Sequence, residues 1–167
     1  ELGARFRNLS PEPAQDGCAL PHPVALSGLA DGVAVEPPAV VNCATALALA
    51  DLVQSAIEPA ARRALGSPVV GIDQASGYVC RPRAGTAKLS EHAFGKALDI
   101  AAFRLADGRT LAVTTASAGA QKAFLDALRK AACGPFKTVL GPGSDADHAT
   151  HLHLDLAPRR SGAAICQ

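Results

Sequence analysis

The segment DADHATHLHLDLAP, residues 145–158, gathers three of the five histidines of the chain. In its second half, HLHLDLA, polar residues alternate with leucines. Successive side chains of a β-strand point to opposite faces, so we predict His151, His153 and Asp155 on one face and the leucines on the other. Residues on one face lie about 6.5–7 Å apart, which lets two imidazoles bind one metal ion, or lets one bind while its neighbour transfers protons.

A second polar cluster lies about fifty residues upstream, in SEHAFGKALDIAAF, where His92 and Asp99 stand seven positions apart. Imidazole and carboxylate are ligands that suit zinc. With one histidine of the later strand they make a set of three protein ligands, which leaves zinc an open position for water. The spacing does not decide which strand histidine binds. His148 is expected to approach the same place from the preceding loop.

The elements that must position these residues follow from periodicity and turn signals. Helical spacing of apolar residues predicts one helix over 43–65, kinked or split by Pro59, and another over 120–132 that Gly134 and Pro135 terminate. The segment SPVVGIDQASGYVC is predicted to form a strand, a turn and a second short strand. Single strands are predicted in KALDIAAFRL, TLAVT, KTVLG and HLHLDLA, with the turn DGR before TLAVT. Residues 10–41 are rich in proline and are predicted to form an irregular arm.

This order of elements predicts an α+β fold, a mostly antiparallel sheet with helices packed on it. We expect a tail over 1–16 and a single domain over 17–167, acting as a monomer. A formal net charge of +1 on 167 residues argues against a nucleic-acid partner. No apolar run approaches the roughly 20 residues that span a bilayer, so no integral membrane segment is predicted. The first residue is not methionine, from which we expect that an upstream segment was removed, by processing or when the protein was prepared.

The five cysteines, at positions 18, 43, 80, 133 and 166, are widely spread and include no C-x-x-C pair. Two disulfides and one free thiol are expected, with pairings that the sequence leaves open. Five buried reduced cysteines in a cytosolic protein are the alternative. Because disulfides persist in oxidising compartments, the first interpretation places the protein in the periplasm or cell envelope.

The two clusters also resemble those of a known group of enzymes. SEHAFGKALDI fits Ser-x-His-x-x-Gly-x-Ala-x-Asp, and HATHLH fits His-x-x-His-x-His, the signatures of the LAS-type zinc peptidases (lysostaphin, D-Ala-D-Ala metallopeptidases and the hedgehog fold). From about Gly17 to the final ICQ, the chain resembles the bacterial extensin-like C-terminal domain family. The resemblance implies a zinc peptidase core that is cross-linked by disulfides.

Roles for individual residues follow from this resemblance. It implies that the zinc ligands are His92, Asp99 and His153, and that His151 stands beside them as general base. His148 would be an auxiliary hydrogen-bonding partner of the same catalytic group.

Further residues ahead of the first motif would serve the substrate. Arg81 would bind a substrate carboxylate or stabilise the developing oxyanion, and Arg83 is a weaker candidate for the same role. Ser90 would contact substrate or hold the turn, rather than act as a nucleophile. Gly95 would allow a close backbone approach, and Glu91 is expected to face solvent.

The activity implied is zinc-dependent hydrolysis of peptide bonds in the stems or crosslinks of peptidoglycan. Thr150 stands where the carboxypeptidase and dipeptidase branches carry glutamate, so a murein endopeptidase with a histidine base is favoured over a D,D-carboxypeptidase or dipeptidase. The alternative from another class is a non-catalytic cell-wall-binding module with a structural zinc, closed by Asp155 or His151 as fourth ligand.

Overall fold

A computed structural model describes residues 3–11, 13–159 and 161–167. Its strands form a mixed sheet whose path runs β1-β2-β3-β4-β5-β8-β7-β9, with β6 paired to β5. The strands are β1 Arg5–Asn8, β2 Pro23–Gly28, β3 Ala34–Asn42, β4 Val69–Ser76, β5 Ala97–Leu105, β6 Thr110–Ala112, β7 Thr138–Leu140, β8 Leu152–Asp155 and β9 Ile165–Cys166. All neighbouring pairs on this path are antiparallel except β3–β4 and β7–β9, which confirms a mostly antiparallel α+β fold.

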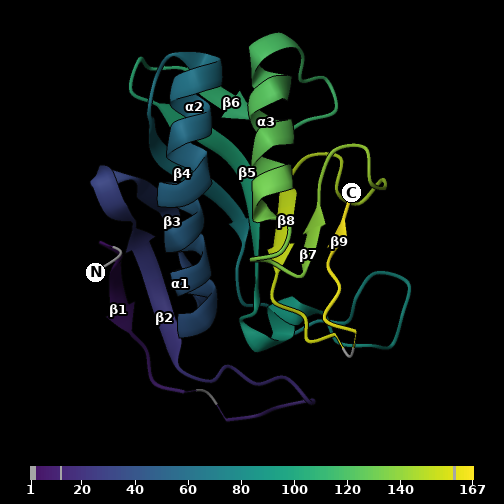
Figure 1. Ribbon diagram of the computed structural model, residues 1–167. Coiled ribbons are helices and arrows are strands. Elements are labelled where there is room, and N and C mark those ends of the chain that lie inside the picture. The colour runs from purple at the N-terminus through teal and green to yellow at the C-terminus, as the bar shows by residue number, and fades with distance from the viewer. Residues whose placement is uncertain (1–2, 12, 160) are drawn as a thin grey trace.

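The helices cover one face of this sheet (Figure 1). The first predicted helix is confirmed over its whole length: α1 Cys43–Leu52 continues through a π-helical turn, η2 Val53–Ile57, into α2 Glu58–Leu65. A proline inside a helix removes one backbone donor and crowds the preceding turn. Pro59 is the second residue of α2, just after the widened π turn, so the helix is interrupted near it without being broken. The second helix, α3 Gly119–Ala132, is also confirmed.

The core lies between the helices and the sheet. Phe103 of β5 packs edge-on against Phe124 of α3, with 5.2 Å between ring centroids. Leu152 and Leu154 of β8 are buried in the same apolar cluster. Alternation along β8 therefore holds His153 and Asp155 on the opposite side from the core, as the sequence predicts.

The irregular arm predicted over 10–41 is wrong, because most of β2 and β3 lies within that range. Pro37 and Pro38 had suggested irregular structure. In the structure, β3 pairs with β4 through Ala34–Glu36 and with β2 at Ala34 and through Ala39–Asn42. The two prolines fall between these paired stretches, where no ladder hydrogen bond needs their missing N–H groups.

Two further predictions about strands differ from the structure. Within the segment 1–16 predicted as a tail, Arg5–Asn8 forms β1, while residues 1, 2 and 12 lie outside the described residues. The second short strand predicted at the end of SPVVGIDQASGYVC is absent from the described chain. The backbone N–H groups there are used elsewhere, since Tyr78 donates to Val40 and Val79 donates to His92.

The expected count of two disulfides and one thiol is confirmed. Cys18 is bonded to Cys80, and Cys133 is bonded to Cys166. Cys43 is free and exposed. The disulfides fit a protein of the cell envelope or the extracellular space. No helix in the described part of the chain has the length and apolar character needed to cross a membrane.

Because Cys43 is the exposed free cysteine, we expect one thiol per chain to react with a water-soluble thiol reagent in the native protein without reductant. Denaturation without reductant should leave the count unchanged, and Cys43→Ser should abolish labelling. Mass spectrometry of the labelled protein measures both. Additional labelling in the native wild type would contradict the two pairings.

Candidate metal centre

The register of two neighbouring strands brings the two polar clusters together. In the antiparallel pair β5–β8, Asp99 lies directly opposite His153. Directly opposed residues share one face of the sheet, so both side chains project away from the core. Each is buried. A hydrogen bond of 2.8 Å joins Nδ1 of His153 to Oδ1 of Asp99.

His92 reaches the same place from a short 3₁₀ turn, η3 Glu91–Phe94. The side chain of Ser90 caps this turn by accepting from the His92 backbone N–H. Gly95 ends it with φ of +61°, and a Cβ there would lie 2.2 Å from Leu20 and 2.8 Å from the backbone of Asn42. The close backbone approach expected at Gly95 is therefore confirmed.

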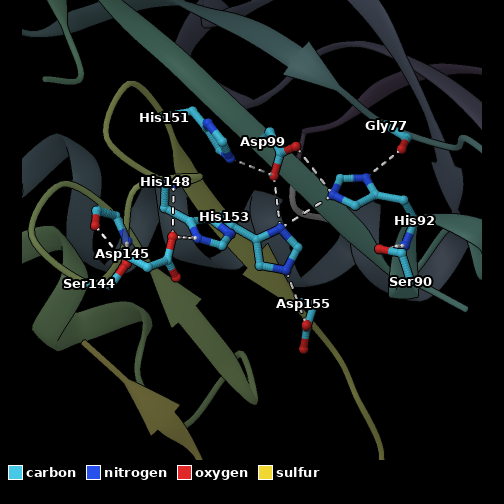
Figure 2. A network of polar contacts seen from close by, with 11 residues as sticks. Gly77, Ser90, His92, Asp99, Ser144, Asp145, His148, His151, His153 and Asp155 are labelled. Carbon is cyan, nitrogen blue, oxygen red and sulfur yellow. Dashed lines mark hydrogen bonds and ion pairs between the residues drawn. The ribbon is translucent and has the colours of Figure 1, made fainter. Parts of the chain in front are cut away.

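The three side chains present a compact group of donor atoms (Figure 2). One ligand atom each from His92, Asp99 and His153 lie within 4.8 Å of one another, so the group could hold a metal ion. Nε2 of His92 lies 3.2 Å from Oδ2 of Asp99 and 3.3 Å from Nδ1 of His153.

The outer nitrogen of each imidazole has an acceptor of its own. Nδ1 of His92 donates to the Gly77 carbonyl at 2.6 Å, which leaves Nε2 to face the other two candidate ligands. Nε2 of His153 lies 3.1 Å from Oδ2 of Asp155, and the Asp155 carboxylate also accepts from the Ala157 backbone at 2.9 Å. Such outer partners fix the orientation of metal-binding histidines. Asp155 therefore lies on the nitrogen of His153 that faces away from Asp99, which argues against Asp155 as a fourth ligand.

Charges within the group stabilise one another. Burial opposes ionisation of Asp99, but hydrogen bonds from His153 and His92 outweigh it and hold the Asp99 pKa below its usual range. Burial would also lower the pKa of His153, yet the hydrogen bonds to Asp155 and Asp99 raise it to about 9. Without a metal, His153 is thus an imidazolium held between two carboxylates.

His151 lies beside this group, in the bend that precedes β8. Its Nε2 is 3.7 Å from Oδ1 of Asp99, and its side chain is about one-fifth exposed. Burial lowers the pKa of His151, an effect that the Asp99 charge partly offsets. His151 is consequently neutral at neutral pH and can accept a proton.

His148 approaches from the loop, as expected. Its ring centroid lies 5.2 Å from that of His151 and 5.6 Å from that of His153. Nδ1 of His148 lies 2.6 Å from Oδ1 of Asp145, and the hydrogen bond from His148 lowers the pKa of that carboxyl. Asp145 thereby fixes Nδ1 of His148 as a donor and leaves Nε2 as the nitrogen that can accept.

All of these side chains border a cleft of about 530 Å³, together with Arg81, Arg83 and Ser90. Arg81 is exposed. The prediction that Glu91 faces solvent is wrong: Glu91 is buried, and it accepts from Nη2 of Arg83 at 2.9 Å. A buried carboxylate needs a partner, and Arg83 provides it across the turn. The charge of Arg83 is therefore already balanced.

Sequence reasoning did not select several residues that border the cleft. Asp145 stands three positions before His148, a spacing at which an Asp can bond back within a turn, and that spacing was the available signal. Thr138, Arg159 and Gln167 come from β7 and from the segment that follows β8. Pairing of β9 with β7 brings this segment to the cleft, and no local sequence pattern predicts that pairing.

Comparison with known proteins gives one family. The sequence matches the family described as Extensin-like protein C-terminus over residues 1–167. No curated protein and no solved structure matches the chain.

Proposed function

We propose that this chain, which belongs to the Extensin-like protein C-terminus family, is a zinc-dependent peptidase that hydrolyses peptide bonds in peptidoglycan. The observation that carries the proposal is the arrangement around the three donor atoms. His92, Asp99 and His153 converge at the wall of a cleft, with the neutral imidazole of His151 beside them. The likeness of both motifs to those of LAS-type zinc peptidases supports the same activity.

The residues present fit zinc. Two imidazole nitrogens and one carboxylate oxygen form a donor set of the borderline and hard type that zinc accepts, and three protein ligands are typical of its catalytic sites. The outer nitrogens of both histidines are held by Gly77 and Asp155, as in metal sites where a second layer of hydrogen bonds orients the ligands. When bound, zinc polarises the scissile carbonyl and lets water act as a nucleophile near neutral pH.

The other side chains transfer protons and orient the substrate. Nε2 of His151 accepts the proton of the attacking water and returns it to the leaving amine. Asp145 keeps His148 oriented beside His151, so that His148 is available as a hydrogen-bonding partner. Arg81 binds a substrate carboxylate or the developing oxyanion. Because Thr150 stands where the carboxypeptidase and dipeptidase branches carry glutamate, a histidine base and hence an endopeptidase are favoured over a carboxypeptidase.

Digestion of purified crosslinked muropeptides by the zinc-loaded protein tests this function. Mass spectrometry is expected to show each dimer converted into two monomers by the addition of one water. Release of a single terminal amino acid would instead identify a carboxypeptidase. Intact muropeptides in the presence of fully metal-loaded protein would overturn the peptidase and favour a wall-binding module with a structural zinc.

Zinc binding is expected to release about one proton per chain at pH 7. Both nitrogens of His153 face carboxylate oxygens, and its pKa is raised to about 9, so zinc must displace the Nδ1 proton. A raised pKa means that the proton is bound below pH 9 and absent above it, so the release should shrink as pH rises through 9. Calorimetry in two buffers of different ionisation enthalpy measures the release. Binding at pH 7 without any proton release would contradict the assignment of Nδ1 as the ligand atom.

A further inference from the structure

Three arginines border the cleft, and they differ in whether a carboxylate already neutralises them. Arg83 is paired with Glu91. Among the described residues, no Asp or Glu side chain forms an ion pair with Arg81 or Arg159. Arg81 is exposed on its loop, whereas Arg159 is half-buried against β7.

Arg159 is held at a fixed position relative to the metal centre. Its Nε donates to the Lys137 carbonyl at 3.3 Å, and its Nη2 donates to Oγ1 of Thr138 at 2.6 Å. Thr138 lies directly opposite Asp155 in the β7–β8 pair. Asp155 in turn binds His153. Arg159 is thus held on the β7 residue that pairs with Asp155, the hydrogen-bonding partner of the candidate ligand His153.

This guanidinium keeps unused donors at the cleft wall. A guanidinium has five N–H groups, and the two bonds to Lys137 and Thr138 leave three of them without an acceptor among the described residues. Among the described residues, Asp99 and Asp155 form ion pairs with His153, and neither forms one with Arg159. The free N–H groups are therefore available to a carboxylate on a molecule that enters the cleft. A planar fork with parallel N–H groups fits a carboxylate.

We propose that Arg159 binds a carboxylate of the substrate, so that the cleft selects peptides with a free carboxylate close to the bond that is cut. The inference rests on the proposed peptidase function and gives it a substrate class. It also separates the arginines: Arg159 recognises the substrate, whereas Arg83 stabilises the turn that carries His92.

The test compares one crosslinked muropeptide with the same muropeptide after conversion of its carboxylates to amides by carbodiimide and ammonia. Wild type is expected to hydrolyse the free-carboxylate form with the higher kcat/KM. Arg159→Gln should raise KM for that form by about tenfold to a hundredfold, the effect of losing charge-assisted hydrogen bonds, with a smaller change in kcat. The amidated form should be affected little, and Arg159→Lys should restore part of the preference.

Controls separate recognition from structure. Arg63→Gln removes one exposed charge on α2, outside the cleft, and should leave both KM values unchanged. Thermal unfolding with and without zinc shows whether Arg159→Gln keeps the fold and the metal. Equal losses for the free and amidated peptides would assign Arg159 a purely structural role and overturn the inference.

A binding measurement keeps this test independent of catalysis. Calorimetry with zinc-loaded His151→Ala should show that the free-carboxylate muropeptide binds more tightly than the amidated one, and that adding Arg159→Gln reduces the difference. Carboxylate-dependent binding without hydrolysis by the wild type would refute the peptidase and still support the role of Arg159. Equal affinity for both peptides in protein that retains Arg159 would overturn that role.

Discussion

Purified His153→Ala is expected to contain almost no zinc and to lose more than about 1,000-fold in peptide hydrolysis. The reason is that the variant removes one of three ligands, and the Lewis-acid contribution of a bound metal amounts to several kcal/mol. Asp99→Asn is expected to behave in the same way, since it keeps the size of the side chain and removes the charged ligand. Metal analysis after dialysis, with turnover on crosslinked muropeptides, measures both effects.

Two further variants calibrate this result. Asp155→Asn alters the outer partner of His153 without removing a ligand, so zinc affinity should fall by about tenfold to a hundredfold and not vanish. His22→Asn changes the one histidine outside the cleft, at a positive φ of 48° that asparagine tolerates, and should have no effect. Full zinc retention by His153→Ala would transfer the ligand role to His151 and refute the present assignment.

His151→Ala is expected to keep the metal and the fold while turnover falls by about 100-fold to 10,000-fold, the usual contribution of a positioned general base. His151 is outside the apolar core and is not one of the three grouped donors. Zinc content, thermal unfolding and kcat on muropeptides measure the three expectations separately.

The pH dependence should change in the same variant. Burial lowers the pKa of His151, so wild-type activity should stay high down to a pH below the ordinary histidine range and then fall as the base becomes protonated. His151→Ala should lack this acidic limb. If His151→Ala stays nearly as active as wild type, the base lies elsewhere, and His148 with its partner Asp145 is the next candidate. If it loses zinc, His151 is a fourth ligand, and the structural-zinc alternative gains support.

Local sequence patterns determined the elements and the character of the site. The strict alternation in HLHLDLA directs His153 and Asp155 away from the core, because successive residues of a strand face opposite sides. The 3.6-residue period of residues 43–65 predicts a helix for the same kind of reason. Both rules act within one element, so they can be applied before the fold is known. The set of His92, Asp99 and one later histidine as candidate ligands also followed from residue types and spacing.

Only the tertiary structure decided which groups complete the site. Pairing of β5 with β8 sets Asp99 against His153, although 54 positions separate them in the chain. The Gly77 carbonyl that orients His92 and the Arg83 that neutralises Glu91 come from segments without any local signal of these contacts. Each depends on strand register and chain crossing, which arise from the packing of the whole sheet.

The dependence on strand pairing also explains what the sequence analysis got wrong in residues 10–41 and what it missed at Arg159. The prolines in residues 10–41 suggested irregular structure. Pro37 and Pro38, however, lie in a stretch of β3 that pairs with neither neighbouring strand, so no ladder bond is lost. Arg159 reaches the cleft because β9 pairs with β7 after the chain has turned back. Sequence periodicity reports which way a side chain faces within its element, whereas its neighbours are set by strand order and register, which depend on distant residues.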